Sequence, residues 1–231
     1  MSSSADESFA RGLSALQAGH VEDAERSFKK ALRLQPRHVP ALNVYSILLT
    51  QVRRYEEAEQ YIERAIQENA TSDASFYNYG VILNALKRPG EAIEQFNRAL
   101  AINGSVPETL NARGESHLEL KHLDAAIADF DSALAKNPKL TDALVNKARA
   151  LAELEKFDIG LSVIDQALAL GPSNELAWLA RGRVLNGLKR YEEALDAFAR
   201  ALAIQPDLAE AWLGRGSSFA LPSLFSFERS A

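Results

Sequence analysis

The chain has 231 residues, of which 47% are hydrophobic and 25% are charged, a balance typical of a folded protein. Its 31 acidic and 26 basic side chains give a net charge of −5 with no basic block, which argues against a nucleic-acid partner. Cysteine is absent, which excludes disulfides, thiolate nucleophiles and cysteine-rich zinc sites.

The N-terminal stretch MSSSADESFARGL has no basic segment followed by an apolar core, so it does not resemble a secretion signal. No apolar run in the sequence approaches the roughly 18 residues of a membrane span. We therefore expect a cytoplasmic protein that does not contact a membrane.

Helical segments follow one another in chain order with a period of 34 residues. After a lead-in at 1–4, six full repeats are expected over 5–208, each holding two helices of about 12–15 residues. Their ranges are 5–38, 39–72, 73–106, 107–140, 141–174 and 175–208. A seventh first helix, at 209–221, is expected to cap the array with Trp212 and Phe219. Pro222 is expected to interrupt it, leaving an apolar tail at 222–231.

Three series of residues define the period. Each second helix carries a small residue and, four positions later, a bulky one that should fill the space between neighbouring helices. The bulky series is Phe28, Ile62, Phe96, Phe130, Ile164 and Phe198. The small series is Ala24, Ala58, Ala92, Ala126, Gly160 and Ala194. First helices carry a further small series, which should let paired helices cross closely: Gly12, Ser46, Gly80, Gly114, Ala148, Gly182 and Gly216.

These series resemble the tetratricopeptide repeat over about 90% of the chain. The family motif is matched in the sixth repeat by Trp178, Gly182, Ala194, Phe198, Ala201 and Pro206. The resemblance implies an all-α fold, a right-handed superhelical α-solenoid of antiparallel helix pairs. Stretches such as ALNVYSILLTQVRRYEEAEQYI are also similar to the repeat arms of bacterial O-linked N-acetylglucosamine transferases.

One position departs from the family motif, which has leucine before the small residue of the first helix. Here it holds Arg11, Tyr45, Tyr79, Arg113, Lys147, Arg181 and Arg215. The last four are basic at strict 34-residue steps, and we favour the interpretation that their stems pack between helices while their charged heads meet carboxylates such as Asp131, Asp165 or Asp196. The alternative is a basic ladder that binds a ligand.

The resemblance also implies that first helices line a concave groove. Candidate peptide-binding residues there are Phe9, Leu13, Asn43, Ile47, Tyr77, Val81, Asn84, Asn111, Glu115, Arg149 and Arg183. We expect a peptide segment of another protein in this groove, with asparagines bonding its backbone and Tyr77 as an aromatic anchor. The alternative is a solvated groove whose residues serve solubility.

No catalytic, cofactor-binding or metal site is expected, because the four histidines fit turn or packing positions and nucleotide-binding and hydrolase motifs are absent. The leading hypothesis is therefore a non-enzymatic protein–protein interaction scaffold. One alternative is the substrate-targeting arm of a glycosyltransferase separated from its catalytic domain. Another is a homo-oligomer formed through Leu224, Phe225 and Phe227. The tail could also fold back on the capping helix, or be the remnant of a larger protein.

Overall fold

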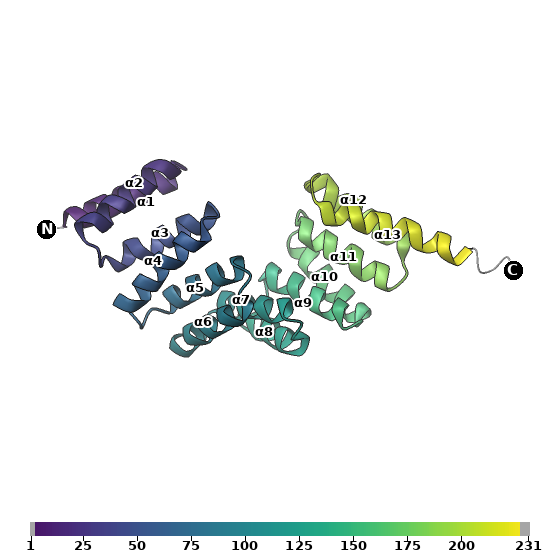
Figure 1. The fold of residues 1–231 in the computed structure, drawn as a ribbon. Coiled ribbons are helices and arrows are strands. Elements are labelled where there is room, and N and C mark those ends of the chain that lie inside the picture. Colours follow the sequence, from purple (N-terminus) through teal and green to yellow (C-terminus); the bar gives the residue numbers. More distant parts are fainter. Residues whose placement is uncertain (1–2, 227–231) are drawn as a thin grey trace. The chain divides into compact units, whose positions relative to one another are not determined.

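The computed structural model describes the backbone of residues 3–226 and the side chains of residues 3–218. These residues form thirteen α-helices and no strand, which confirms the all-α prediction (Figure 1). In chain order the helices are α1 (Ser4–Gln17), α2 (Val21–Leu34), α3 (Val39–Gln51), α4 (Tyr55–Glu68), α5 (Asp73–Ala85), α6 (Pro89–Ile102), α7 (Pro107–Glu119), α8 (Leu123–Lys136), α9 (Thr141–Glu153), α10 (Phe157–Leu170), α11 (Glu175–Gly187), α12 (Tyr191–Ile204) and α13 (Ala209–Ser226).

Within each unit, consecutive helices pack as adjacent hairpins joined by short turns, the arrangement of a helical-repeat solenoid. The chain divides into two compact units, each described by itself below. Unit 1 is Met1–Ser116 and unit 2 is His117–Ala231, so the division falls inside α7.

Left-handed backbone conformations close the first helix of each pair. Gly19 has a φ of 76°, and five non-glycine residues at the equivalent point have φ between 57° and 61°. Those five are Arg53, Lys87, Lys121, Glu155 and Lys189. The next backbone N–H then bonds five residues back, as from Arg54 to the Leu49 carbonyl oxygen at 2.9 Å. Because this conformation costs a non-glycine residue roughly 1–2 kcal/mol, packing of the helix pair must hold each turn in place.

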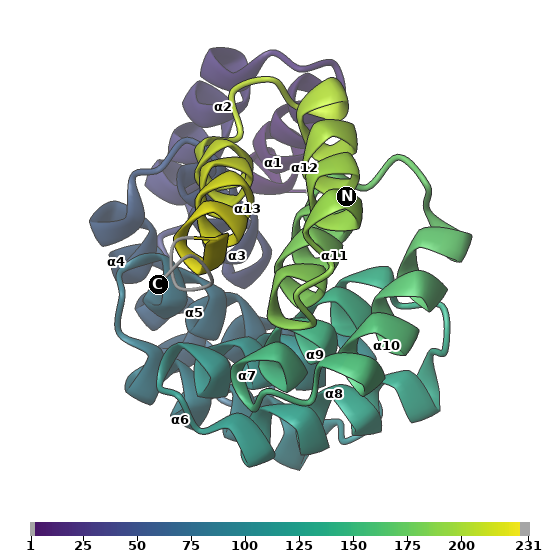
Figure 2. The same cartoon turned by 90° about the vertical axis from the view of Figure 1, so that its right-hand side faces the viewer.

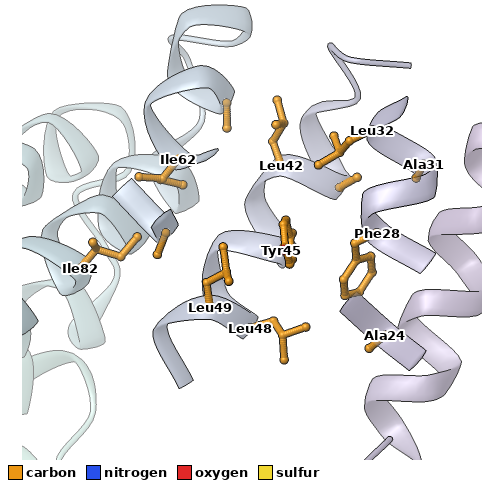
Figure 3. Packing of buried hydrophobic residues seen from close by; sticks show 13 residues of the cluster. Ala24, Phe28, Ala31, Leu32, Leu42, Tyr45, Leu48, Leu49, Ile62 and Ile82 are labelled. Carbon is orange, nitrogen blue, oxygen red and sulfur yellow. The ribbon is translucent and has the colours of Figure 1, made fainter. Parts of the chain in front are cut away.

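The bulky series of the second helices lies at the centre of the core, as predicted. All six of its side chains, from Phe28 to Phe198, have no exposed surface. In unit 1, Phe28 of α2 and Tyr45 of α3 point toward one another with ring centroids 6.2 Å apart (Figure 3). The alanines of the small series are equally buried and let the helices approach.

Glycines in the first helices make room for the phenylalanine rings. A Cβ added to Gly12 would lie 2.5 Å from the Phe28 ring, and one added to Gly182 would lie 2.5 Å from the Phe198 ring. Gly80 and Phe96 form a third pair of this kind. In each pair the phenylalanine follows the glycine by 16 residues. The gap that the glycine leaves for the ring, here called the notch, therefore recurs with the repeat.

The last helix differs from the sequence prediction in two respects. It runs from Ala209 to Ser226 and so continues through Pro222 rather than ending at 221. The fixed φ of proline is helical, and its main cost inside a helix is the backbone hydrogen bond that its nitrogen cannot donate. Trp212 does not act as a core residue of a cap, because 54% of it is exposed and Ala211 occupies the buried position. Phe219 lies beyond the described side chains.

Candidate functional site

The structure distributes the candidate peptide-binding residues over first helices of both units. Nine lie in unit 1, on α1 (Phe9, Leu13), α3 (Asn43, Ile47), α5 (Tyr77, Val81, Asn84) and α7 (Asn111, Glu115). The other two lie in unit 2, Arg149 on α9 and Arg183 on α11. The unit 1 set is therefore the larger candidate surface.

The aromatic candidates of unit 1 are half-buried in the core. Phe9 lies between Phe28 and His38, with ring centroids 5.9 and 5.1 Å away. Tyr77 packs on Phe96 at 6.0 Å. Ile47 is the more accessible apolar candidate, with 36% of its surface exposed. The rings thus hold the helices together and present only part of their surface.

Several polar candidates already have partners within the chain. The Asn84 Oδ1 accepts a hydrogen bond from the Ser116 hydroxyl at 2.9 Å, joining α5 to α7. The Asn43 side-chain amide donates to the Val39 carbonyl oxygen of its own helix at 3.3 Å, and its Oδ1 is buried without a partner. In unit 2, Arg183 pairs with Glu210 at 2.7 Å. These contacts orient the side chains but use part of their bonding capacity.

Two negatively charged side chains, Glu115 and Glu108, act on Tyr77. Burial raises the pKa of its phenol, and the negative charges of Glu115 and Glu108 raise it further. Tyr77 on α5 and the two carboxylates on α7 are therefore close enough to interact electrostatically. This corner of unit 1 combines an aromatic face with negative charge.

A repeated network of partly buried polar groups joins successive repeats in unit 1. The Tyr45 hydroxyl donates to Glu25 Oε1 at 2.8 Å, and Arg54 donates to the same oxygen at 2.8 Å. Arg54 also donates to both carboxylate oxygens of Glu57. One repeat later, Tyr79, Glu59, Arg88 and Glu91 reproduce this arrangement. Sequence inspection did not find this network, although its members recur at 34-residue steps.

Two basic residues of the series that departs from the family motif, Lys147 and Arg181, pack as expected in unit 2. Lys147 pairs with Asp131 at 2.5 Å and Arg181 with Asp165 at 2.9 Å, each joining a first helix to the preceding second helix. The expectation for Asp196 was wrong, because its carboxylate pairs with Arg200, one turn along the same helix. Arg215 lies over the Trp212 ring instead, 5.1 Å from its centroid.

The Glu25 network predicts a specific pH dependence of stability. Burial favours the neutral acid, but hydrogen bonds from Lys29, Arg54 and Tyr45 outweigh it and lower the pKa of Glu25 from 4.5 to about 2. A lowered folded-state pKa stabilises the fold above the unfolded value, and this contribution is lost as pH falls toward 2. Glu25→Gln should therefore cost about 2 kcal/mol at neutral pH, allowing for partial solvent screening.

Urea denaturation of Glu25→Gln and the unsubstituted chain across the acid range tests this prediction. The stability difference should shrink steadily as pH falls from about 4.5 to about 2. Glu94→Gln, at an exposed position on α6, is the matched control. A difference that stays constant with pH would mean that Glu25 acts through packing and not through its charge.

A surface pocket of about 540 Å³ lies between α10, α11 and α12 of unit 2. Its lining includes Trp178, with the Arg200 guanidinium 4.8 Å from the ring centroid. The charges of Arg181 and Arg200 in this pocket are matched by Asp165 and Asp196. The lining also holds Glu192 and Glu193, of which Glu193 pairs with Arg190, so carboxylates outnumber guanidinium groups in this pocket.

Within the described part of the chain, no three histidine, aspartate or glutamate side chains are grouped so that they could hold a metal ion. None of the described helices has the length and apolar character needed to cross a membrane. Among the proposed self-association residues, Phe227 lies outside the described residues, and the side chains of Leu224 and Phe225 lie outside the described side chains.

Solved structures with similar folds include the Cut9–Hcn1 hetero-tetramer of the APC/C, with a TM-score of 0.83 and 20% identity. That match covers 93% of this chain, but the chain spans only 42% of the matched chain. PilW, described as a type IV pilus biogenesis factor, matches with a TM-score of 0.82 and 17% identity over 92% of this chain and 99% of its own.

YrrB, described as a tetratricopeptide repeat protein with an unusual peptide-binding site, matches with a TM-score of 0.61 and 21% identity over 82% of this chain and 97% of its own. At these identities the likenesses establish the fold alone. No curated protein sequence matches the chain significantly.

The family model for the tetratricopeptide repeat matches residues 9–74, 51–107, 111–158 and 145–209, which together span most of the chain. The same residues form the helix pairs described above, with their bulky series buried at each step. The chain therefore belongs to the tetratricopeptide repeat family.

Proposed function

We propose that unit 1 binds a peptide segment of another protein on its first helices. The chain is a tetratricopeptide repeat protein, and proteins built from such repeats use their extended surfaces for protein–protein interaction. A relative of similar fold, YrrB, is described as having a peptide-binding site. The proposal thus assigns peptide binding to the first helices of unit 1.

The observation that carries the proposal is a row of side chains at one position per repeat, here called the first-helix row. It consists of Leu13 on α1, Ile47 on α3, Val81 on α5 and Glu115 on α7. The row is apolar in three helices and ends in a carboxylate. Ile47 is exposed and the other apolar members are half-buried, so a bound side chain could remove further apolar surface from water.

The negative charge at the end of the first-helix row favours a peptide that carries a basic residue. Glu115 and Glu108 already act on Tyr77, so a cation placed at this corner would meet both carboxylates and an aromatic face. Asn43 and Asn84 contribute less to recognition, because both bond within the chain. We therefore propose a short segment that carries apolar side chains followed by lysine or arginine.

A displayed library of random short peptides, selected on the full chain, tests this proposal. Enriched peptides should combine apolar and basic residues, and their affinity should fall as salt is added. Ile47→Glu should weaken their binding about tenfold or more, because it places a charge against an apolar side chain. Ile159→Glu, at a 56% exposed position on α10 of unit 2, is the matched control and should bind normally. Equal affinity of both variants would move the site away from the first-helix row.

A further inference from the structure

The last helix, α13, packs on α12 and α11 of unit 2 in the way that earlier first helices pack on the helices before them. The Ser218 hydroxyl donates to Asn186 Oδ1 at 2.8 Å, as Ser116 does to Asn84 in unit 1. The Trp212 indole N–H donates to the Pro206 carbonyl oxygen at 3.0 Å, as Trp178 does to Pro172. The helix lies beside α12 and α11 (Figures 1 and 2). Its inner face, with Ala211 and Ser218, is buried.

The opposite face of α13, with Trp212, Leu213 and Gly216, is open. Leu213 is 75% exposed, whereas Leu179, its equivalent one repeat earlier, is 4% exposed. Trp212 is 54% exposed. A Cβ added to Gly216 would meet no atom of the described side chains within 4 Å, whereas one added to Gly182 would clash with Phe198. Among the described residues, a helix that is built as the first of a pair therefore presents its pairing face without a second helix on it.

The size of the first-helix residue at the notch correlates with the size of the second-helix side chain that packs there. In the sequence, Gly12, Gly80, Gly114 and Gly182 are each followed 16 residues later by phenylalanine. The two repeats with a larger residue at this point, Ser46 and Ala148, have isoleucine instead, Ile62 and Ile164. A notch without a side chain thus accompanies an aromatic ring, and a partly filled notch accompanies a smaller branched side chain. By this rule Gly216 is shaped for an aromatic ring.

We propose that this face of α13 binds an amphipathic helix from another polypeptide, which seats an aromatic ring on Gly216 and apolar side chains on Trp212 and Leu213. The chain's own second helices define the chemistry of the partner. In α12 the ring of Phe198 is flanked by Ala194 and Ala201, whose small side chains permit close approach. This site lies in unit 2 and is separate from the peptide site proposed for unit 1.

The probe for this site is a fluorescently labelled peptide with the sequence of residues 189–206, which contains α12. Anisotropy should show saturable binding to the full chain. A second peptide, in which phenylalanine 198 is replaced by alanine, should bind about tenfold more weakly or not at all, because it lacks the ring. Leu213→Glu in the chain should also abolish binding. Since Leu213 is exposed, this variant should fold normally, as circular dichroism would verify.

Three outcomes would overturn the proposal. One is the absence of saturable binding by the peptide that carries the ring. The second is equal affinity for the Leu213→Glu chain, which would mean that the peptide displaces α12 from α11 instead of binding α13. The third is a dimer in analytical ultracentrifugation that Leu213→Glu converts to a monomer, because the face would then belong to a second copy of the chain. Ile159→Glu controls for a new charge elsewhere on unit 2 and should leave binding unchanged.

Discussion

Replacing Phe28 with alanine should lower the free energy of unfolding of the α1–α2 hairpin by about 3–5 kcal/mol. The Phe28 ring has no exposed surface and packs against Phe9 and Tyr45 at centroid distances of 5.9 and 6.2 Å. Gly12 lies against the same ring and has no side chain that could move into the space left behind. The cavity should therefore stay open, which places the cost at the upper end for an aromatic residue.

The loss should be local, because each repeat contacts mainly its neighbours and stability in such arrays is close to a sum over adjacent repeats. Hydrogen exchange of α1 and α2 amides should accelerate on the order of a hundredfold or more, whereas exchange in α10–α12 should not change. Val21→Ala, at an exposed position on α2, is the control. Equal acceleration in both units would show that the array unfolds as a single cooperative block, contrary to this prediction.

The sequence was sufficient to predict the helices and the core because both depend on the same period. A residue that recurs every 34 positions occupies the same environment in every repeat, so the burial of Phe28 and Phe198 could be inferred from a single rule. The pairing of Lys147 with Asp131 and of Arg181 with Asp165 followed from the same geometry. In each case repetition supplied information that one copy of the repeat would not have contained.

Features that depend on individual side chains could not be predicted in this way. Asn84 was selected as a free polar group, but whether its oxygen meets Ser116 depends on rotamers in two helices. The left-handed turns were also missed, because only Gly19 has the residue type that signals this conformation. Trp212 was expected in the core of a cap, yet its indole bonds the preceding turn and its ring stays exposed. The motif match identified the position of Trp212 without identifying which neighbours would cover it.

Gly182→Ala and Gly216→Ala should change stability in opposite directions, although the two glycines occupy equivalent positions one repeat apart. Alanine at 182 would place a Cβ 2.5 Å from the Phe198 ring. That ring cannot move away easily, because Gly214 of α13 also lies against it, at Cζ, Cε1 and Cε2. The variant should lose about 2 kcal/mol through overpacking, even after the better helix propensity of alanine is included. Urea denaturation monitored by circular dichroism would measure both variants.

Alanine at 216 should instead stabilise α13 by up to about 1 kcal/mol, because no atom of the described part of the chain lies within 4 Å of the new methyl group and glycine is a poor helix former. A neutral or stabilising Gly182→Ala would mean that the Phe198 ring shifts freely and that the notch does not select an aromatic side chain. A destabilising Gly216→Ala would mean that the open face of α13 is already covered in solution. If that loss disappeared on dilution, a second copy of the chain would be the cover; if it persisted, the cover would belong to the same chain. If Gly182→Ala destabilises the fold and Gly216→Ala stabilises it, the notch at Gly216 is unoccupied in the unsubstituted chain. A partner helix requires this state.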